Sequence, residues 1–319
     1  MISSNAFGKS GIYRANGATI AEAAALLRAG GIVAVPTETV YGLAADAANP
    51  EAVAAIYRTK GRPDFNPLIV HVGDVAAARR IADLDERAER LARHFWPGPM
   101  TMVLPVAPGA AVTAAVTAGL STIAIRVPAH PVMQRLLALS GLALAAPSAN
   151  RSGAISPTRA PHVLNSLGDA APMILDGGPC ETGLESTIIA LRPAGWQLLR
   201  RGPITAEQIE AVMQSSPLPV TDSAIEAPGQ LAGHYAPSKA LRLNAVTAHK
   251  NEWHIGFGDI AGDDNLSAAG DLAAAAARLF DALHIADASD RAAIAVAPVP
   301  KAGIGAAIAD RLARAANRQ

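Results

Sequence analysis

The chain has 319 residues, no formal net charge at pH 7, and a composition that is 50% hydrophobic and 17% charged. These values allow a sizeable core, so they exclude a largely disordered chain and a protein held on nucleic acid by bulk charge. The single cysteine, Cys180, excludes an internal disulfide and is typical of a reducing compartment. Neither a signal-peptide start nor a membrane-length apolar run is recognisable, so we expect a cytoplasmic protein without a membrane partner.

Helical and strand patterns alternate through the first two-thirds of the chain. The segment TIAEAAALLRAGG predicts a helix capped at Thr19 and stopped at Gly30. In residues 49–61, Asn49 is the expected N-cap, Pro50 the first helical residue and Gly61 the stop. Further helices are predicted within residues 75–94 (two helices), 130–141 and 205–213, and strands over 32–37, 67–72, 100–106, 121–128, 142–148, 172–178, 186–191 and 196–200. This alternation predicts an α/β fold.

The last third of the chain begins with a change in composition. Residues 214–240 are rich in Pro, Gly and Ser and are too long for an ordinary connection, so we interpret them as a linker. Beyond it, strands are predicted over 253–258 and 292–299 and helices over 268–283 and 304–316. The expected organisation is a first domain over residues 1–213, a linker over 214–240 and a small second α/β domain over 241–319.

Polar side chains interrupt or follow several of the predicted strands. Arg126 lies within an apolar strand, where a guanidinium needs either an acid from elsewhere in the chain or an anionic ligand. Ser148 and Asn150 are two residues apart, so an extended segment would point both toward one ligand, whereas a simple turn is the alternative.

The stretch from Arg90 to Gly168 contains no Asp or Glu but six arginines, namely Arg90, Arg93, Arg126, Arg135, Arg151 and Arg159. It is either an Ala/Pro-rich stretch that happens to lack acids or a segment that lines a site for anions. The chain has no G-x-x-x-x-G-K-[ST] loop, no G-x-G-x-x-G after a strand and no paired metal-ligand spacing. We therefore expect any bound anion to be held by arginine, lysine and hydroxyl groups from several strands.

In their order along the chain, these segments resemble the Sua5/YrdC family, the threonylcarbamoyl-AMP synthases. The resemblance rests on KGR (Lys60, Arg62) and SAN (Ser148, Asn150), together with PTETVYGL, NPLIVH, WPGPMT and ESTII, over residues 15–210. The segments GHYAP and GIGAAIADRLARAA are similar to the linker and C-terminal domain of the two-domain Sua5 form. The resemblance implies a YrdC-type twisted open sheet around a basic cavity, plus a small Rossmann-like α/β C-terminal domain.

The resemblance also implies a reaction, in which L-threonine, bicarbonate and ATP with Mg²⁺ give threonylcarbamoyl-adenylate and pyrophosphate. A complex that modifies tRNA would receive the product for N6-threonylcarbamoyladenosine (t6A), and no protein-bound metal site is expected. Because every species is anionic, such a site needs positioning and positive charge more than a protein nucleophile.

Site residues follow from the same resemblance. The implied threonine contacts are Thr39, His71, Arg126 and Ser186. The implied ATP contacts are Arg62, Asn66, Thr122, Ser148, Asn150, Ser156, Arg200 and Tyr235. Lys60 and Arg62 are the implied catalytic residues, which neutralise or orient the phosphates. Tyr235 is expected in a lid formed by the linker.

Two other classes of protein remain as alternatives at this stage. A double-stranded RNA or tRNA-binding module is one, although residues 1–210 hold 18 basic and 16 acidic side chains, so we expect at most a weak tRNA contact. A carbamoyl-transfer domain of the hydrogenase-maturation type is the other. Those proteins also carry acylphosphatase and zinc-finger segments, which one cysteine cannot supply.

Overall fold

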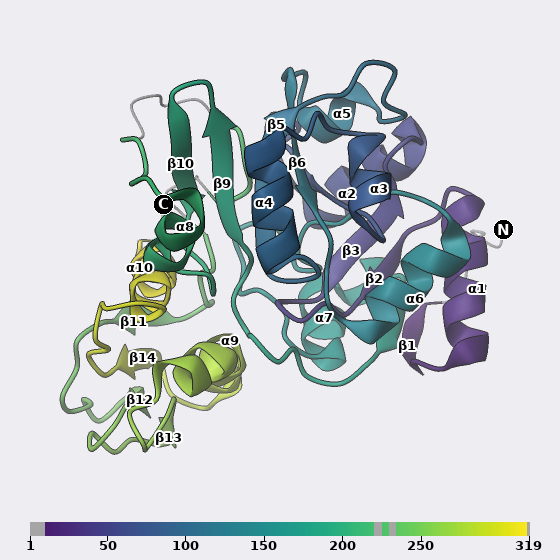
Figure 1. Ribbon diagram of the computed structural model, residues 1–319. Coiled ribbons are helices and arrows are strands. Elements are labelled where there is room, and N and C mark those ends of the chain that lie inside the picture. Colours follow the sequence, from purple (N-terminus) through teal and green to yellow (C-terminus); the bar gives the residue numbers. More distant parts are fainter. Residues whose placement is uncertain (1–9, 220–224, 230–233, 318–319) are drawn as a thin grey trace, which may run out of the picture.

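The structure is a computed structural model that describes residues 10–219, 225–229 and 234–317. Two α/β units follow one another along the chain, a larger one coloured purple to green and a smaller one coloured green to yellow (Figure 1). The α/β class predicted from the sequence, with a second and smaller α/β unit, is confirmed.

The larger unit is built on a mixed sheet. Its strands are β1 (Gly11–Arg14), β2 (Val33–Val35), β3 (Gly42–Asp46), β4 (Ile69–His71), β5 (Met100–Pro105), β6 (Thr122–Arg126), β7 (Leu144–Ala145), β8 (Met173–Asp176), β9 (Thr187–Arg192) and β10 (Gly195–Arg200). Their order in the sheet is β1-β8-β2-β3-β7-β4-β6-β5-β9-β10.

The directions of four strands bring distant parts of the chain to one edge of this sheet. Strand β4 is parallel to β6, β6 is antiparallel to β5, β5 is parallel to β9, and β9 is antiparallel to β10. The carboxyl ends of β4, β6 and β10 therefore lie at the same edge as the start of β9. Polar residues at these four strand ends therefore lie close together at this edge of the sheet.

The helices of the larger unit are α1 (Gly17–Arg28), α2 (Pro50–Lys60), α3 (Val75–Arg79), α4 (Glu86–Phe95), α5 (Ala114–Thr117), α6 (Pro131–Ser140), α7 (Ala160–Leu167) and α8 (Ala206–Met213). Helix α2 confirms its prediction in full, because the Asn49 side chain caps it, Pro50 opens it and Gly61 ends it at φ 58°. The prediction for α1 was wrong at its start. Asn16 is the N-cap, and the Thr19 side chain completes a capping box from the third helical position.

Several elements were not predicted, and each has weak sequence signals. Helix α7 has no side-chain cap, because its N-cap residue, Arg159, makes no capping hydrogen bond, and helix α5 has only four residues. Strand β1 is a short edge strand that pairs with β8 alone. Short elements with weak capping or periodicity signals are stabilised mainly by the neighbouring elements on which they pack.

The smaller unit has a four-stranded parallel sheet in the order β11-β14-β12-β13. Its elements are β11 (Ala240–Arg242), β12 (Glu252–Gly256), β13 (Asp264–Asn265), β14 (Ala293–Val296), α9 (Leu272–Ala288) and α10 (Gly305–Ala316). The prediction that the first of its helices begins at Ala268 was wrong, because the Asp271 side chain caps α9 one turn later. The parallel sheet agrees with the Rossmann-like unit implied by the resemblance.

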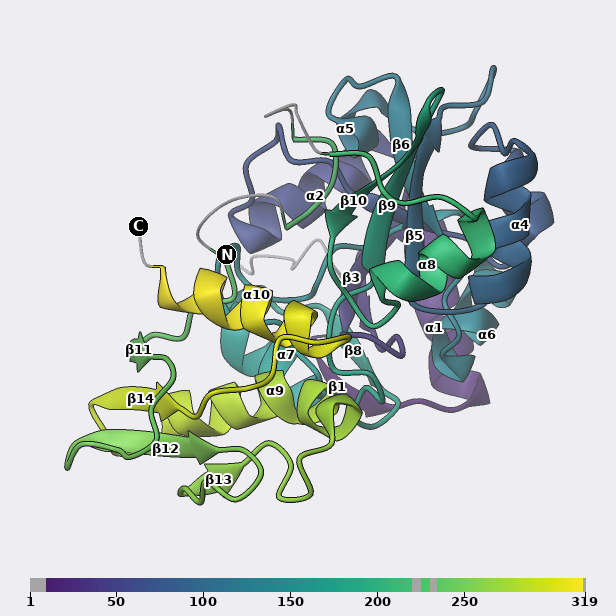
Figure 2. The ribbon, with the colours of Figure 1, turned by 60° about the vertical axis from the view of Figure 1, so that its left-hand side comes forward.

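The apolar core of the smaller unit extends into the larger unit. Leu184 and Ile155 of the larger unit, together with Tyr235, belong to the buried cluster built on α9. Figure 2 shows α9 and α10 on the side of the small sheet that faces the larger unit. The predicted linker over 214–240 is described only in part, since residues 220–224 and 230–233 lie outside the described residues. The predicted boundaries of the domains stay predictions.

Within the described residues, every helix is either too short or too polar to cross a lipid bilayer.

Candidate functional site

Eight of the predicted site residues line one pocket at the shared strand edge. They are Thr39, Arg62, His71, Arg126, Ser148, Ser186, Arg200 and Tyr235. The edge explains the grouping, because His71 ends β4, Arg126 ends β6, Arg200 ends β10 and Ser186 directly precedes β9. Residues more than 160 positions apart in the chain thus converge on one cavity, as expected if they bind one set of ligands.

Arg126 has a partner for each of its three guanidinium nitrogens. It is 3% exposed and lies beside His71 in register across the parallel β4–β6 pair. Its Nη1 donates to the Thr39 hydroxyl at 2.9 Å, and its Nε donates to the Gly98 carbonyl at 3.1 Å. Its Nη2 lies 2.7 Å from Glu38 Oε1 in an ion pair. Of the two partners considered from the sequence, the acid from elsewhere in the chain is present.

Glu38 is a residue of this site that the sequence analysis missed. Burial opposes its ionisation, but the Arg126 charge and the hydrogen bonds from Arg126 and the Ala129 N–H hold its pKa below the ordinary value. Because Glu38 lies inside the quoted PTETVYGL segment, the reasoning applied to Arg126 could have found it. A charged residue in an apolar stretch that becomes a buried strand edge needs a partner of opposite charge.

Arg200 holds Ser186 in place at the wall of the pocket. Its Nη2 donates to Ser186 Oγ and its Nε donates to the Ser186 carbonyl, both at 3.0 Å. Ser186 Oγ also lies 2.7 Å from Thr101 Oγ1, so the serine hydroxyl is held from two sides. Two neighbouring residues predicted to bind different substrates, threonine and ATP, are therefore rigidly connected.

Arg62 and Lys60, the two cations of the KGR segment, have different surroundings. Arg62 lines the pocket, donates to the carbonyls of Asn66 and Pro67, and has its pKa lowered to about 10 by burial. Lys60 does not line the pocket. Its Nζ donates to the backbone carbonyls of Ser148, at 2.6 Å, and Asn150.

Lys60 therefore holds the SAN segment in place. Burial drives the pKa of this lysine well below its ordinary value. Of the two alternatives considered for Ser148 and Asn150, an extended segment and a turn, the structure has the turn, because residues 149 and 150 form a bend. The Asn150 side chain donates to the carbonyls of Arg151 and Ala154 instead of facing the pocket.

Five predicted site residues do not line the pocket, namely Lys60, Asn66, Thr122, Asn150 and Ser156. Thr122 starts β6, at the opposite end of the strand from Arg126. Ser156 is fully buried and donates its hydroxyl to Glu185 Oε1. Of the six arginines in the acid-free stretch, Arg126 alone lines the pocket, together with Ala146, Pro147 and Ser148 of the same stretch, so the stretch lines this site only in part.

Two histidines and a tyrosine present unsatisfied polar atoms to this site. Within the described part of the chain, His71 Nδ1, His234 Nδ1 and Tyr235 Oη are buried without a hydrogen-bond partner. Burial, with Arg126 nearby, lowers the pKa of His71 to about 3, so its imidazole is neutral near pH 7. Orphaned buried polar atoms are unfavourable, and a polar ligand would satisfy them.

The pocket is narrow as it stands, with a free volume of about 40 Å³. Pockets that hold small-molecule ligands commonly measure about 300–1,000 Å³, so this space holds neither an amino acid nor a nucleotide. The fully buried Tyr235 and the nearly buried His234 line it. Substrates can enter only if these two side chains, or the segment that carries them, move.

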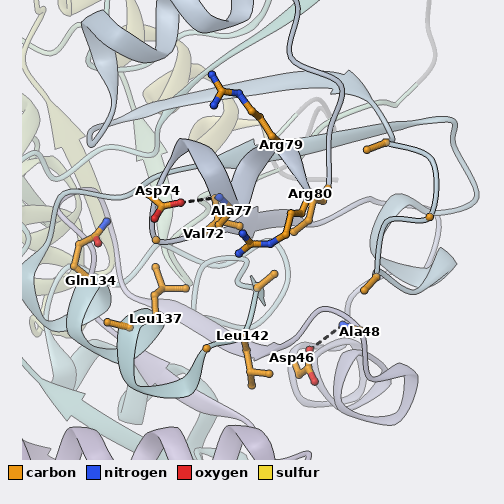
Figure 3. Close-up of a pocket in the computed structure, with 18 of the residues that line it drawn as sticks. Asp46, Ala48, Val72, Asp74, Ala77, Arg79, Arg80, Gln134, Leu137 and Leu142 are labelled. Carbon is orange, nitrogen blue, oxygen red and sulfur yellow. Dashed lines mark hydrogen bonds between the residues drawn. The ribbon is translucent and has the colours of Figure 1, made fainter.

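A much larger depression, of about 890 Å³, lies elsewhere on the molecule (Figure 3). Its wall includes Arg79, Arg80, Asp74 and Gln134 together with many small apolar residues. None of the predicted site residues lines it. Since charge convergence and burial matter more for this chemistry than volume, we assign the site to the narrow pocket.

Comparison with known proteins agrees with this geometry. The family model Sua5_yciO_yrdC, described as "Telomere recombination", matches residues 25–202, and the model "Threonylcarbamoyl-AMP synthase, C-terminal domain" matches 204–317. The Threonylcarbamoyl-AMP synthase of Bacillus subtilis is 40% identical, over 94% of each chain. This chain belongs to the Sua5/YrdC family of threonylcarbamoyl-AMP synthases. A second member, from Pyrococcus abyssi, is 37% identical to it over 92% of each chain.

Solved structures place this Sua5-family chain in the two-domain form. The crystal structure of P. abyssi Sua5 complexed with L-threonine superposes with a TM-score of 0.87 at 35% identity, over 96% of each chain. Escherichia coli YciO, at 22% identity and a TM-score of 0.53, covers 61% of this chain and shares the fold alone. The resemblance described from the sequence is confirmed, whereas the alternative of an RNA-binding module gains no support.

Proposed function

We propose that this Sua5-family protein is an L-threonylcarbamoyladenylate synthase, a nucleotidyltransferase that forms threonylcarbamoyl-AMP and pyrophosphate from L-threonine, bicarbonate and ATP. The observation that carries the proposal is the pocket itself, in which Arg62, Arg126 and Arg200 converge with His71 and the Ser186 hydroxyl. Three guanidinium groups suit a substrate carboxylate and a triphosphate. The product would pass to a complex that modifies tRNA.

The chemistry requires no protein nucleophile. The threonine amine and bicarbonate give a carbamate with loss of water. A carbamate oxygen then forms a bond to the α-phosphorus of ATP, and the bond from that phosphorus to the pyrophosphate oxygen breaks. Positive charge that is fixed before the reaction stabilises the charge that develops on the phosphoryl oxygens. Cys180 is buried, and burial raises the pKa of its thiol, which suits a structural residue.

We assign the threonine end of the pocket to Thr39, His71, Arg126 and Ser186. Arg126 would share its guanidinium between Glu38 and the substrate carboxylate, and neutral His71 would contact the amine or hydroxyl through its orphaned nitrogen. Arg62, Ser148, Arg200 and Tyr235 form the ATP end. Asn66, Thr122, Asn150 and Ser156, also expected at ATP, lie outside the pocket lining, so we propose that they act by supporting it.

Magnesium would arrive with ATP. Within the described residues, no group of three or more His, Cys, Asp and Glu side chains could hold a metal ion. The Glu185 carboxylate in the pocket wall is already bonded to Ser156 and Arg311. These residues do not fit a dedicated metal site, and Mg²⁺ commonly binds through substrate phosphates.

The experiment that tests this proposal is pyrophosphate release from ATP with each substrate omitted in turn. We expect release that requires both L-threonine and bicarbonate, because the carbamate is the attacking group. L-2-aminobutyrate is the matched control, since it differs from L-threonine only in lacking the hydroxyl. Release at the same rate without threonine would refute the proposed reaction.

A further inference from the structure

One short loop of the larger unit, residues 183–186, connects the pocket to the smaller unit. We call it the site loop. Gly183 packs against the backbone of α9, so that a Cβ built on it would lie 2.4 Å from the Ala277 carbonyl oxygen. Leu184 is fully buried in the core cluster of the smaller unit. Glu185 pairs with Arg311 of α10, and Ser186, the last residue of the loop, lines the pocket.

Arg311 is the centre of this connection. It is 1% exposed, and its Nε donates to Glu185 Oε2 at 2.8 Å. Its Nη2 donates to the Arg201 carbonyl at 2.9 Å, and its guanidinium lies 5.0 Å from the ring centroid of Tyr235. A single side chain of the smaller unit thus contacts the site loop, the end of β10 and the tyrosine that fills the pocket.

We propose that Arg311 is a positioning residue of the active site, through which the smaller unit fixes the site loop and Tyr235 in their binding arrangement. This inference rests on the proposed function. It also gives the second unit a specific task, which is to hold Ser186 where threonine needs it. Arg311 does not line the pocket, so its effect passes through Glu185 and Tyr235.

The geometry favours this role over simple packing. Ser186 follows Glu185 directly and is bonded to Arg200 and Thr101, so a shift of Glu185 would disturb both hydrogen bonds of the serine. Displacements of about 1 Å at a reacting centre commonly cost on the order of a hundredfold in rate. A guanidinium bonded to Glu185, to the Arg201 carbonyl and to Asp310 fixes both the direction and the distance of the loop.

The ionisation of the Glu185 carboxyl group also depends on Arg311. Burial opposes its ionisation, but the charges of Arg311 and Arg200 and the hydrogen bonds from Ser156 and Arg311 hold its pKa below the ordinary value. Without Arg311 the buried carboxylate would lose its strongest partner and take up a proton at higher pH. The position of Ser186 would then depend on pH.

The test compares four purified full-length variants with the wild type, namely Arg311→Met, Arg311→Lys, the double variant Arg311→Met/Glu185→Gln, and Arg314→Met. Arg314 is the matched control, because it lies on the same helix, also pairs with Asp310 and does not line the pocket. Direct binding of L-threonine by calorimetry without ATP is measured beside the steady-state kinetics of pyrophosphate release.

For Arg311→Met we expect a KM and a Kd for L-threonine at least about tenfold above those of Arg314→Met. We also expect a raised KM for ATP, because Arg311 contacts Tyr235, which we assigned to the ATP end. The threonine affinity of Arg311→Met should fall from about pH 8 to 6, whereas the wild type and the double variant should not show this dependence. Arg311→Lys retains the positive charge, so its threonine affinity should lie between those of Arg311→Met and the wild type.

If Arg311→Met fails to fold, the double variant and Arg311→Lys decide the matter, because neither leaves an unpaired buried carboxylate. Threonine affinity in folded Arg311 variants within about twofold of Arg314→Met, with no new pH dependence, would overturn the inference while leaving the proposed function intact. A wild type that binds threonine but releases no pyrophosphate would refute the function and leave the binding comparison valid. A wild type that neither binds threonine nor releases pyrophosphate would refute both the proposed function and the role of Arg311.

Discussion

Arg126 and Glu38 form a buried ion pair at the wall of the pocket, with side-chain exposures of 3% and 8%. Removing one member of such a pair leaves the other charged and desolvated, which is usually more damaging than the pair is stabilising. The substrate carboxylate would therefore meet a guanidinium whose orientation is already fixed by Thr39 and Gly98. Substitution of Arg126 should therefore affect threonine binding more than ATP binding.

We expect Arg126→Ala to weaken L-threonine binding by about 2–5 kcal/mol and to change ATP binding much less. Calorimetric titration with each ligand measures both values. The control is Arg126→Ala/Glu38→Gln, which removes the unpaired carboxylate and so separates lost binding from lost stability. Equal losses for both ligands in that double variant would count against the assignment.

Lys60 supplies a second prediction at this scale. Lys60→Met should lower the free energy of unfolding by about 1–3 kcal/mol for each carbonyl left without its donor, and should reduce turnover at least about a hundredfold by releasing the Ser148 turn. Arg62→Met, which acts in the pocket itself, should also reduce turnover at least about a hundredfold. The exposed Lys250→Met is the control. Pyrophosphate release at the wild-type rate from both site variants would remove their proposed roles.

Elements with strong local signals were predictable from the sequence. The Asn49 cap, Pro50 and Gly61 define α2 without help from the rest of the chain. Helix α7 and strand β1 carry no comparable signals and depend on their neighbours. Eight of the residues implied by the resemblance line the pocket. The pairing of Glu38 with Arg126 and of Glu185 with Arg311 was not predicted, because a buried charge finds its partner only in the tertiary fold.

Helix α1 offers a test at the scale of the element. Asn16→Ala removes the side-chain oxygen that accepts hydrogen bonds from the N–H groups of Ala18 and Thr19. We expect a loss of about 1 kcal/mol in the free energy of unfolding, measured by urea denaturation, with threonine affinity unchanged. A loss of affinity without a loss of stability would show that α1 influences the pocket in a way this fold does not explain.

At the scale of the whole molecule, three nearly or fully buried histidines connect stability to pH. Burial is the largest cause that lowers the pKa of His71, His162 and His234 to about 3. His162 lies where the two units meet, stacked on His284 of α9 with ring centroids 3.9 Å apart, beside Asp281 and Arg159. The neutral form of each imidazole is therefore the one that the folded state accommodates.

These three histidines make the free energy of unfolding depend on pH. Below about pH 6.5 the unfolded chain binds protons at these histidines and the folded chain does not, so stability falls as the pH falls. At about pH 5.5 each fully depressed histidine costs about 1.4 kcal/mol relative to pH 7.5. Urea denaturation at both values should show a loss of several kcal/mol, and His162→Gln should reduce that loss by about one histidine's share. Equal stability at both values would contradict the burial of these side chains.

The central claim is that one pocket joins L-threonine, bicarbonate and ATP. The most direct measurement is mass spectrometry of the adenylate formed from isotopically labelled bicarbonate, with labelled L-threonine in a parallel reaction. We expect threonylcarbamoyl-AMP that carries the label from each substrate, formed together with pyrophosphate by the wild type and lost in Arg126→Ala/Glu38→Gln. AMP or pyrophosphate without a labelled adenylate, or tRNA binding without any turnover of ATP, would contradict it.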